Sequence, residues 1–592
     1  MPSHTHTPLA RPIPAEVTQA SKPADATQSR PAEVARAASP WTAKPPVCVA
    51  RAASPCDGAP RRPLGFGISG FGIYLGFGIL GFGISTLAPA AAPTYSSAAR
   101  SAKPNIILIN CDDLGFGDTS AYGATAIKTP NVDRLAREGV RFTNAYATSA
   151  TCTPSRFSML TGEYAWRRDA AILPGDAPLI IAPGRQTLPA LLRSAGYTTA
   201  IVGKWHLGLG TGNIDWNGDI KPGPLEVGFD ESFIMAATCD RVPCVYIDNH
   251  RILNLDPADP IRVSYKQNFP GEPTGLSNPE LVRVKPAENV HAGTIVNGIG
   301  RIGYSTGGKS ALWKDEDMAD VFIKRAVDFI DRHADASANG APFFLYYAAH
   351  EPHVPRVPNP RFVGVTGLGP RGDSIAEMDW CVGQLLAALE RHNLLHNTLI
   401  IFTSDNGPIL GDGYMDGAID LNGAHRPAGN LRGTKYSMFE GGTHIPLIVS
   451  WPGRVRPGVS DALVSQLDFP ASLAALVGGR LDPVASPDSQ NMLAALLGDS
   501  LQGRADFVEE GEGSRALTLR QGPWKYIPPH KGPHYTYYEH VETGNDPKPQ
   551  LYNYDDDPGE SLNLAEKYPE RVRDMAARLA EIIGEPAATT KQ

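Results

Sequence analysis

Short apolar runs alternate with segments of helical spacing from Lys103 onward, and this alternation constrains the fold more than any other feature. The apolar runs are NIILIN (105–110), YTTAIVG (197–203), FFLYYA (343–348), TLIIFTS (398–404) and IPLIVSW (445–451). Short, nearly continuous runs of this kind are typical of buried parallel strands. Helices are expected at 131–139, 187–196, 315–333 and 373–392, the first of them ending at Gly139. The alternation predicts an α/β sheet covered by helices on both sides.

The last hundred or so residues have a different pattern. The stretch ALTLRQGPWKYI (516–527) predicts a β-hairpin with its turn near the Gly-Pro pair. A helix is expected at about 566–583. We therefore predict a large α/β domain over residues 101–479 and a small α+β subdomain over residues 480–592.

The first hundred residues differ from both of these parts. Residues 1–63 are rich in Pro, Ala, Ser and Thr and lack apolar periodicity, so we predict a disordered extension. Residues 64–100 contain a glycine-rich apolar stretch with a GFGI repeat and then a tail of small residues, which resembles a secretory signal and a linker. This predicts export to the periplasm or out of the cell. Membrane attachment is expected only if the 64–92 segment is retained, because its length approaches the ~20 residues of a spanning helix.

Charge and cysteine content exclude two broad classes of protein. A net charge of -8 spread over 592 residues argues against general nucleic-acid binding. Seven cysteines are too few for a disulfide scaffold of this length, and their odd number leaves one unpaired. Cys239 and Cys244 are close enough in sequence for a local bridge, but two free thiols fit equally well.

Two of the predicted strands end in acidic residues. NIILINCDD ends at Asp112 and Asp113, and LIIFTSDNG contains Asp405 and Asn406. Ligands collect at the carboxyl ends of strands in open α/β sheets. Three carboxylates and an amide oxygen placed together need a cation, and oxygen ligands suit Ca²⁺ or Mg²⁺. The alternative is that these are ordinary turn residues that follow strands.

The stretch TCTPSRFSMLTG combines a cysteine with the expected start of a helix. Thr153 is the expected N-cap, Pro154 the first helical residue and Gly162 the end. Cys152 then lies at a helix N-terminus, where backbone N–H groups and the helix dipole favour an anion. Arg156 is one turn further on and can point back to the same place. The alternative is a half-buried cysteine with a structural function.

Three further stretches carry basic and titratable residues. In GKWHLG, Lys204 and His206 are two residues apart and face the same side of an extended chain. HEPHVP contains His350 and His353, and LRGTKYSMFEGG contains Lys435 beside glycines. A fixed charge and an imidazole near an anion site would serve as a clamp and a proton carrier. Each stretch taken singly fits a solvated surface equally well.

Taken together, these stretches resemble the type I sulfatases of the alkaline-phosphatase superfamily, with a likeness to arylsulfatases and N-acetylgalactosamine-6-sulfatases. CTPSR fits the Cys-x-Pro-Ser-Arg signature of that family. NCDDLGFGD, LTGEYAWR, GKWHLG, TSDNGP and LRGTKYSMFEGG are similar to the family's blocks in the family's order, and LYNYDDDPGESLNLAE (551–566) resembles its C-terminal ending. The resemblance spans about residues 104–583. It implies a large mixed, mostly parallel sheet sandwiched by helices, with residues 101–479 as the catalytic domain.

The resemblance also implies that Cys152 is not a thiol in the working protein. In this family a formylglycine-generating maturation enzyme oxidises the motif cysteine to formylglycine (3-oxoalanine), whose aldehyde hydrates to a gem-diol. One hydroxyl would attack sulfur to form a sulfate ester, and the second would lose its proton and expel sulfate. A sulfate ester of serine has no second hydroxyl on the same carbon and could not expel sulfate in this way.

The other roles follow from the same resemblance. The implied ligands of one Ca²⁺ per subunit are Asp112, Asp113, Asp405 and Asn406. Arg156 would hold the formylglycine, and Lys204 and Lys435 would clamp the sulfate oxygens. His206 would take part in proton transfer during ester breakdown.

The family's general acid follows the strand at 343–348 in a His-x-Pro pattern. Both His350 and His353 fit this pattern. The spacing from the strand favours His353 as the sulfate contact and general acid, which leaves His350 a supporting function.

The substrate implied by the resemblance is a sulfated carbohydrate. CDRVPC (239–244) and GAHRPAG (423–429) lie where such enzymes have substrate-facing loops, so Arg241 and His425 are candidate substrate contacts, although solvated loops fit as well. Two alternatives stay open: a phosphonate or phosphate diester hydrolase of the same superfamily, and a non-catalytic glycan-binding relative.

Overall fold

The computed structural model describes residues 103–512 and 516–584. The expectations for the disordered extension (1–63) and the signal-like segment (64–100) lie outside the described residues. Within these two ranges, no helix combines the length and the apolar character that a membrane span requires.

The core of the molecule is a mixed sheet, ten-stranded within the described residues, in the order β15-β2-β14-β13-β1-β12-β4-β5-β6-β7. Its strands are β1 (Asn105–Cys111), β2 (Gly139–Phe142), β4 (Thr198–Lys204), β5 (Glu231–Met235), β6 (Ile247–Asp248), β7 (Arg251–Ile252), β12 (Phe343–Ala348), β13 (Thr398–Ser404), β14 (Leu447–Ser450) and β15 (Gly458–Ser460). The middle strands β13, β1, β12, β4 and β5 run parallel, whereas β14 and β6 pair antiparallel with their inner neighbours. The predicted mixed, mostly parallel sheet is confirmed.

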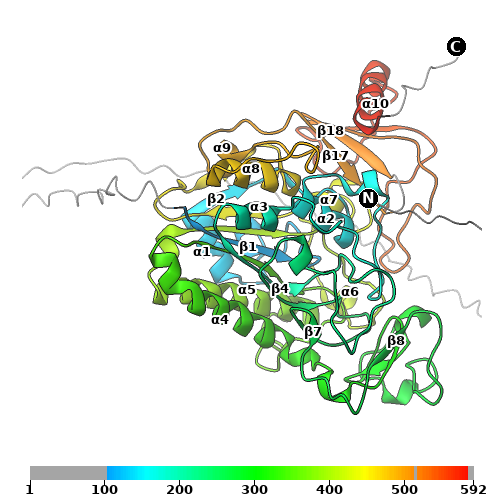
Figure 1. The fold of residues 1–592 in the computed structure, drawn as a ribbon. Coiled ribbons are helices and arrows are strands. Elements are labelled where there is room, and N and C mark those ends of the chain that lie inside the picture. The colour runs from blue at the N-terminus through cyan, green and yellow to red at the C-terminus, as the bar shows by residue number, and fades with distance from the viewer. Residues whose placement is uncertain (1–102, 513–515, 585–592) are drawn as a thin grey trace, which may run out of the picture. The chain divides into compact units, whose positions relative to one another are not determined.

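Helices cover both faces of this sheet (Figure 1). One layer contains α2 (Cys152–Thr161), α3 (Leu188–Ser194) and α8 (Phe469–Val477), and the other contains α1 (Pro130–Glu138), α4 (Met318–Ala338) and α5 (Gly369–Arg391). Successive side chains of β1 point to opposite faces: Ile106 and Leu108 pack in the first layer, Ile107 and Ile109 in the second. Each such side chain, when buried, stabilises the fold by about 1.5–3 kcal/mol.

Gly139 ends α1, as expected, but for a different reason. Its φ of -139° is extended, and the residue begins β2 directly. A Cβ at this position would lie 2.3 Å from the carbonyl oxygen of Val449 in β14. The glycine therefore permits close approach of two strands and does not form a left-handed helix cap.

The C-terminal part forms a second, antiparallel sheet. Its strands are β17 (Asp506–Glu510), β18 (Leu517–Gln521), β19 (Trp524–Ile527) and β20 (Gln550–Asn553), and α10 (Pro569–Ile583) packs on it. The predicted hairpin and final helix are both present. The connection between β19 and β20 is long and reaches the large domain, where Glu539 accepts a hydrogen bond from the N–H of Gly411.

The shorter elements fill the connections. The small strand pairs are β3 (Ala145–Tyr146) with β16 (Val464–Ser465), β8 (Arg262–Ser264) with β11 (Tyr304–Thr306), and β9 (Ile295–Val296) with β10 (Ile299–Gly300). The short helices are α6 (Ala418–Leu421), α7 (Glu440–Thr443) and α9 (Leu493–Leu496).

Candidate active site

Four neighbouring parallel strands end at one edge of the large sheet. Their order, β13-β1-β12-β4, brings the ends side by side, and Cys111 of β1 pairs with Ser404 of β13 at the last position of both strands. The polar residues at these ends are Asp112 and Asp113 after β1, Asp405 and Asn406 after β13, His353 after β12, and Lys204 and His206 at and after the end of β4. This is the edge at which open α/β sheets bind ligands.

The three carboxylates at this edge form a compact, buried group. Asp112, Asp113 and Asp405 each have an oxygen within 4.8 Å of the others. Burial, and the adjacent carboxylates, raise the pKa of Asp112 to about 8, although Lys204 opposes the rise. A bound cation would favour the ionised form of all three groups.

The amide of Asn406 completes an oxygen set for a metal. Its Nδ2 donates to Asp113 Oδ1 at 2.7 Å. Among the described residues, its buried Oδ1 has no hydrogen-bond partner, which is costly unless a cation or a water meets it. Three carboxylates and a free amide oxygen fit a hard cation such as Ca²⁺ or Mg²⁺. The acidic cluster can thus bind a metal ion.

Three basic side chains surround the carboxylates. Lys204 Nζ lies 2.7 Å from both carboxylate oxygens of Asp112, and Arg156 Nε donates to Asp405 Oδ2 at 2.8 Å. Burial disfavours the charge of Lys204, but attraction to Asp112 outweighs it and raises the lysine's pKa. These bases are therefore charged at neutral pH.

The third base comes from the loop between α6 and α7. Lys435 Nζ contacts Asp113 Oδ2 at 2.9 Å and Asp412 Oδ2 at 3.0 Å. Its backbone N–H donates to the carbonyl of Pro408 at 2.8 Å, and the N–H of Tyr436 donates to Ala150 at 2.9 Å. The loop is thereby fixed to the segment that leads into α2.

Helix α2 begins at Cys152, with Thr151 as its N-cap. The expectation that Thr153 caps the helix and Pro154 opens it is wrong. The Thr153 hydroxyl donates to the carbonyl oxygen of His206 at 3.0 Å, so it is not available as a cap. The bond joins the helix start to the chain that leaves β4, which brings Cys152 to the strand ends.

The Cys152 side chain is 2% exposed and lies among the charged groups. Its sulfur is within 4.8 Å of a ligand atom of Asp112 and of His353. Burial raises its pKa, although Lys204 and Lys435 oppose the rise. An unmodified Cys152 is accordingly a neutral thiol and a weak nucleophile.

The five cysteines within the described residues are all free thiols. They include Cys239 and Cys244, so the local bridge considered from the sequence is not formed.

The two histidines at the site hold their protons on opposite nitrogens. His206 has φ 55°, and its Nε2 lies 2.9 Å from the carbonyl of Leu173, which assigns the proton to that nitrogen. The buried Nδ1 of His206 then accepts, and it has no partner among the described residues. His353 Nδ1 donates to the carbonyl of Val354 at 2.7 Å, so its Nε2 faces the site, 3.8 Å from Asp113.

Both imidazoles are neutral in the free protein. Burial lowers the pKa of His353 well below its usual value, and Lys435 and Lys204 lower it further. Burial, and then the charge of Lys204, also lower the pKa of His206 well below its usual value. His350 instead lies 3.3 Å from the carboxylate of Glu351 and does not line the cavity that contains Cys152.

An open cavity of about 690 Å³ leads to this buried group. Its lining includes Cys152, Arg241, His353 and Lys435. Arg241 thus lies at the site, with its Nη1 2.9 Å from Asp240. His425 does not line this cavity: its Nε2 lies 2.9 Å from Asp118, in a separate depression. The structure therefore does not bring the two substrate-contact candidates together.

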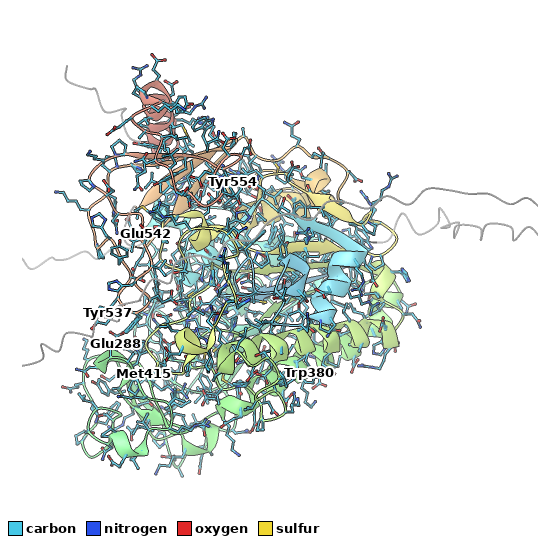
Figure 2. The ribbon with its side chains drawn as sticks, turned by 180° about the vertical axis from the view of Figure 1, so that it is seen from behind. Glu288, Trp380, Met415, Tyr537, Glu542 and Tyr554 are labelled. Carbon is cyan, nitrogen blue, oxygen red and sulfur yellow. The ribbon has the colours of Figure 1, made fainter. Side chains whose placement is uncertain are left out.

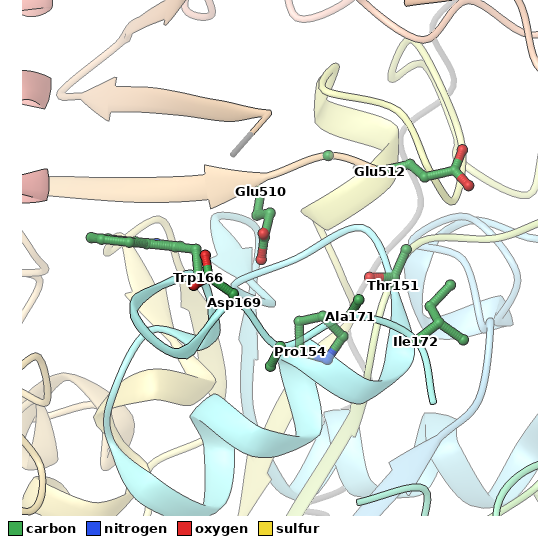
Figure 3. Close-up of a pocket in the computed structure, with 10 residues that line it drawn as sticks. Thr151, Pro154, Trp166, Asp169, Ala171, Ile172, Glu510 and Glu512 are labelled. Atoms are coloured by element: carbon green, nitrogen blue, oxygen red, sulfur yellow. The ribbon is translucent and has the colours of Figure 1, made fainter. Parts of the chain in front are cut away.

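A smaller cavity of about 280 Å³ adjoins the first at Ile172 and Glu512 (Figure 3). It lies beside the start of α2, against Thr151 and Pro154. Glu510, at the end of β17, also lines it.

Several residues that line the site were not predicted from the sequence. The main cavity is also lined by Glu288, His291, Asp412, Glu512, Tyr535, Tyr537 and Tyr538. They come from long connections without periodicity. The one available signal was the aromatic cluster in HYTYYEH (534–540), which is unusual for an otherwise polar loop.

The fold and the site together define a hydrolase of anionic esters. At the carboxyl ends of parallel strands they combine a position for a nucleophile, three positively charged side chains and a group of oxygen atoms suited to a metal ion. A family model described as Sulfatase matches residues 104–479. An N-acetylgalactosamine-6-O-sulfatase of Bacteroides thetaiotaomicron is 50% identical over 484 residues, which cover 81% of this chain and 93% of that protein. Human arylsulfatase A is 31% identical over 487 residues, which cover 78% and 83% of the two chains.

Solved structures agree with these sequence relatives. A Bacteroides thetaiotaomicron structure, from work on the metabolism of multiple glycosaminoglycans, matches with a TM-score of 0.80 at 50% identity, over 82% of this chain and 100% of that chain. The chain belongs to the sulfatase family.

Proposed function

We propose that this enzyme hydrolyses the 6-sulfate ester of N-acetylgalactosamine in a sulfated carbohydrate. The single observation that carries the reaction is the convergence of Cys152, Lys204, Lys435 and His353 on one buried point, at the base of an open cavity. The sugar and the position follow from the 50% identity to an N-acetylgalactosamine-6-O-sulfatase.

Binding of the sulfate group is assigned to the two buried lysines. Lys204 is held in place by Asp112, and Lys435 is held in place by Asp113. A sulfate oxygen between the lysines would gain two charge-assisted hydrogen bonds in a site shielded from water. This pre-formed positive pair also stabilises charge that develops on sulfur's oxygens.

The nucleophile is assigned to residue 152 after conversion to formylglycine by a maturation enzyme. The neutral, buried thiol supports this, because an unmodified Cys152 is poorly activated. Once hydrated, formylglycine supplies a hydroxyl nucleophile and a second hydroxyl for release of sulfate. The free Nδ1 of His206 is suited to accept a proton from residue 152.

The general acid is assigned to His353. Its Nδ1 is committed to the carbonyl of Val354, so a proton on Nε2 would point into the site. In the free enzyme burial disfavours that proton, and the two lysines disfavour it further. A bound sulfate would offset their charge and favour the protonated form, which can donate to the leaving sugar oxygen.

The metal is assigned as Ca²⁺, held by Asp112, Asp113, Asp405 and Asn406. When bound, it would polarise the sulfate and neutralise charge on the oxygens. Arg156, fixed by Asp405, would balance the charge beside residue 152.

Two broader proposals concern the whole chain. Residues 101–479 are proposed as the catalytic domain and residues 480–592 as a C-terminal subdomain. Export is proposed from the sequence of the 64–92 segment.

The test is sulfate release by the full chain, co-expressed with a formylglycine-generating enzyme and supplied with Ca²⁺. The substrates are 6-O- and 4-O-sulfated N-acetylgalactosamine and 6-O-sulfated galactose, with Cys152→Ala as the control. We expect release from the 6-sulfated N-acetylgalactosamine, lost in the control. Silence on all sulfate esters, with hydrolysis of a phosphonate or phosphate diester, would contradict the proposal.

A further inference from the structure

Exposed aromatic side chains gather at the mouth of the main cavity. They belong to residues 533–543, a hairpin within the β19–β20 connection, which we call the tyrosine hairpin. Tyr537 is 85% exposed and Tyr535 is 50% exposed, and both line the cavity that contains Cys152. Figure 2 shows Tyr537 near Glu288, which lines the same cavity. Exposed rings at the rim of a cavity are a feature of binding sites.

The hairpin is closed by its own backbone. The N–H of Thr536 donates to the carbonyl of Val541 at 2.8 Å, and the N–H of Thr543 donates to His534 at 3.0 Å. The rings of Tyr537 and Tyr538 meet edge to face, with centroids 4.9 Å apart. The hairpin is therefore an ordered support for these rings.

The hairpin is also tied to two segments at the cavity, residues 409–412 and the segment that carries Lys435. The half-buried Glu539 carboxylate accepts a hydrogen bond from the N–H of Gly411 at 2.6 Å and another from Leu410. Arg432 forms a bidentate pair with Glu542, with both distances 2.6 Å. Because these bonds form on folding, the hairpin would lose little further conformational entropy when a ligand rests on its rings.

Aromatic rings of this kind suit a sugar. The C–H face of a pyranose packs on an aromatic ring, and a Tyr hydroxyl can exchange hydrogen bonds with sugar hydroxyls. The cavity's volume of about 690 Å³ is in the range of sites for drug-sized ligands, so it can hold more than one pyranose. Lys435, one of the two lysines proposed to bind sulfate, lines the same cavity as the exposed rings.

The smaller cavity of Figure 3 offers no comparable surface. Its aromatic residue, Trp166, is only 7% exposed. The guanidinium of Arg167 lies over the Trp166 ring, 4.4 Å from its centroid. A sugar in that cavity would meet Glu510 and Asp169 and no free ring.

We propose that Tyr535 and Tyr537 form a subsite for the sugar next to the sulfated residue. The tyrosine hairpin then makes the enzyme prefer an oligosaccharide to a sulfated monosaccharide. This inference rests on the proposed function, because the sulfated sugar must occupy the base of the cavity.

The test compares a monosaccharide with an oligosaccharide. The substrates are 6-O-sulfated N-acetylgalactosamine and a trisaccharide with that residue at its non-reducing end. In Tyr537→Ala we expect KM for the trisaccharide to rise about tenfold, as for loss of one stacked ring. KM for the monosaccharide and kcat for both should change less than about twofold. Tyr537→Phe, which retains the ring, should keep most of the preference.

A matched control uses an exposed tyrosine away from the cavity. Tyr568, 37% exposed, packs on Trp524 at the start of α10. Tyr568→Ala should change neither KM nor kcat for either substrate. Equal effects of Tyr537→Ala on both substrates, or none on either, would overturn the inference. A trisaccharide-selective effect of Glu510→Gln in place of Tyr537→Ala would assign the neighbouring sugar to the smaller cavity and would also overturn it.

Binding separates this inference from the proposed function. The dissociation constants of both sugars for Cys152→Ala, measured by calorimetry with and without Tyr537→Ala, need no turnover. A trisaccharide preference that depends on Tyr537 supports the subsite even if the wild-type protein releases no sulfate. Sulfate release by the wild type, without any such preference, supports the proposed function and contradicts the subsite.

Discussion

Two groups of buried charges in this molecule have similar composition and different surroundings. The strand-end cluster comprises Asp112, Asp113, Asp405, Arg156, Lys204 and Lys435, and the C-terminal cluster comprises Glu440, Glu509, Glu560, Arg520 and Lys525. The side chains of both clusters are almost fully buried. The two clusters differ in their contacts and in their access to the main cavity, which is lined by Lys435 of the strand-end cluster.

In the C-terminal cluster, the charged side chains form ion pairs with one another. Lys525 Nζ lies 3.2 Å from Glu440, 2.9 Å from Glu509 and 3.9 Å from Glu560. Burial, and the neighbouring Glu440, raise the pKa of Glu560 to about 8 against the charge of Lys525. A protonated Glu560 leaves two acids for two bases, so the cluster is neutral. It joins α7 to the C-terminal sheet.

In the strand-end cluster, the charges leave capacity for a ligand. Lys435 borders the open cavity together with Cys152. Among the described residues, Asn406 Oδ1 and Arg156 Nη2 have no hydrogen-bond partner. Burial of charge thus does not mark a functional site by itself. Access from an open cavity does, because carboxylate oxygens of Glu440, Glu509 and Glu560 also lack a hydrogen-bond partner among the described residues.

The largest expected effect on stability is at the centre of the C-terminal cluster. Lys525→Met would leave three buried glutamates without their shared cation, and the free energy of unfolding should fall by about 3–5 kcal/mol. Denaturant unfolding of the purified variant measures this. If stability is unchanged and sulfate release is lost, the two clusters have been assigned the wrong way round.

The corresponding change in the strand-end cluster should act on catalysis. Lys435→Met removes a charge aimed at the sulfate, so kcat should fall about 10²–10³-fold. Loss of stability should be smaller than for Lys525→Met, because Asp113 also faces the proposed metal. Steady-state kinetics and thermal unfolding of the same sample test both parts. A variant with normal kcat would exclude Lys435 as a sulfate clamp.

Removal of the proposed Ca²⁺ should affect the strand-end cluster and not the C-terminal cluster. Chelation should abolish sulfate release and lower stability by about 2.7 kcal/mol if Ca²⁺ is normally at 100 times its Kd. Asp405→Asn should weaken the response of the melting temperature to added Ca²⁺, whereas Glu509→Gln should not. An identical response in both variants would argue against a cation at the strand ends.

The smallest expected effect is a pH dependence of stability. Because the folded-state pKa of Glu560 lies near 8, above its unfolded value, the folded state retains a proton that the unfolded state loses. This group therefore lowers stability as pH rises from about 4.5 to about 8. Glu560→Gln should be at least about 1 kcal/mol more stable, relative to wild type, at pH 8.5 than at pH 4. Parallel pH profiles of the two proteins would show that Glu560 is ionised.

The parts of the site that could be predicted lie at the ends of regular elements. Asp112, Asp113, Asp405 and Asn406 follow strands whose continuous apolar runs mark them as central and parallel. Neighbouring parallel strands end at one edge, so the sequence pattern implied the cluster. The sheet itself was predictable for the same reason.

The parts that could not be predicted lie on connections. Asp412 and the tyrosine hairpin reach the cavity through loops, whose path is set by tertiary hydrogen bonds such as those of Glu539. The start of α2 was misjudged because the Thr153 hydroxyl bonds to His206, a partner distant in sequence. His425 lies outside the main cavity, where its Nε2 contacts Asp118, and the path of its loop could not be read from the sequence.

The most direct test of the account measures sulfate release against the state of residue 152. Preparations with different fractions of formylglycine, quantified by peptide mass, are assayed on 6-O-sulfated N-acetylgalactosamine with Ca²⁺ present. We expect a rate proportional to the formylglycine fraction and no measurable rate for Cys152→Ala. A rate that is independent of that fraction, or that persists in Cys152→Ala, would contradict the assignment of residue 152 as the nucleophile.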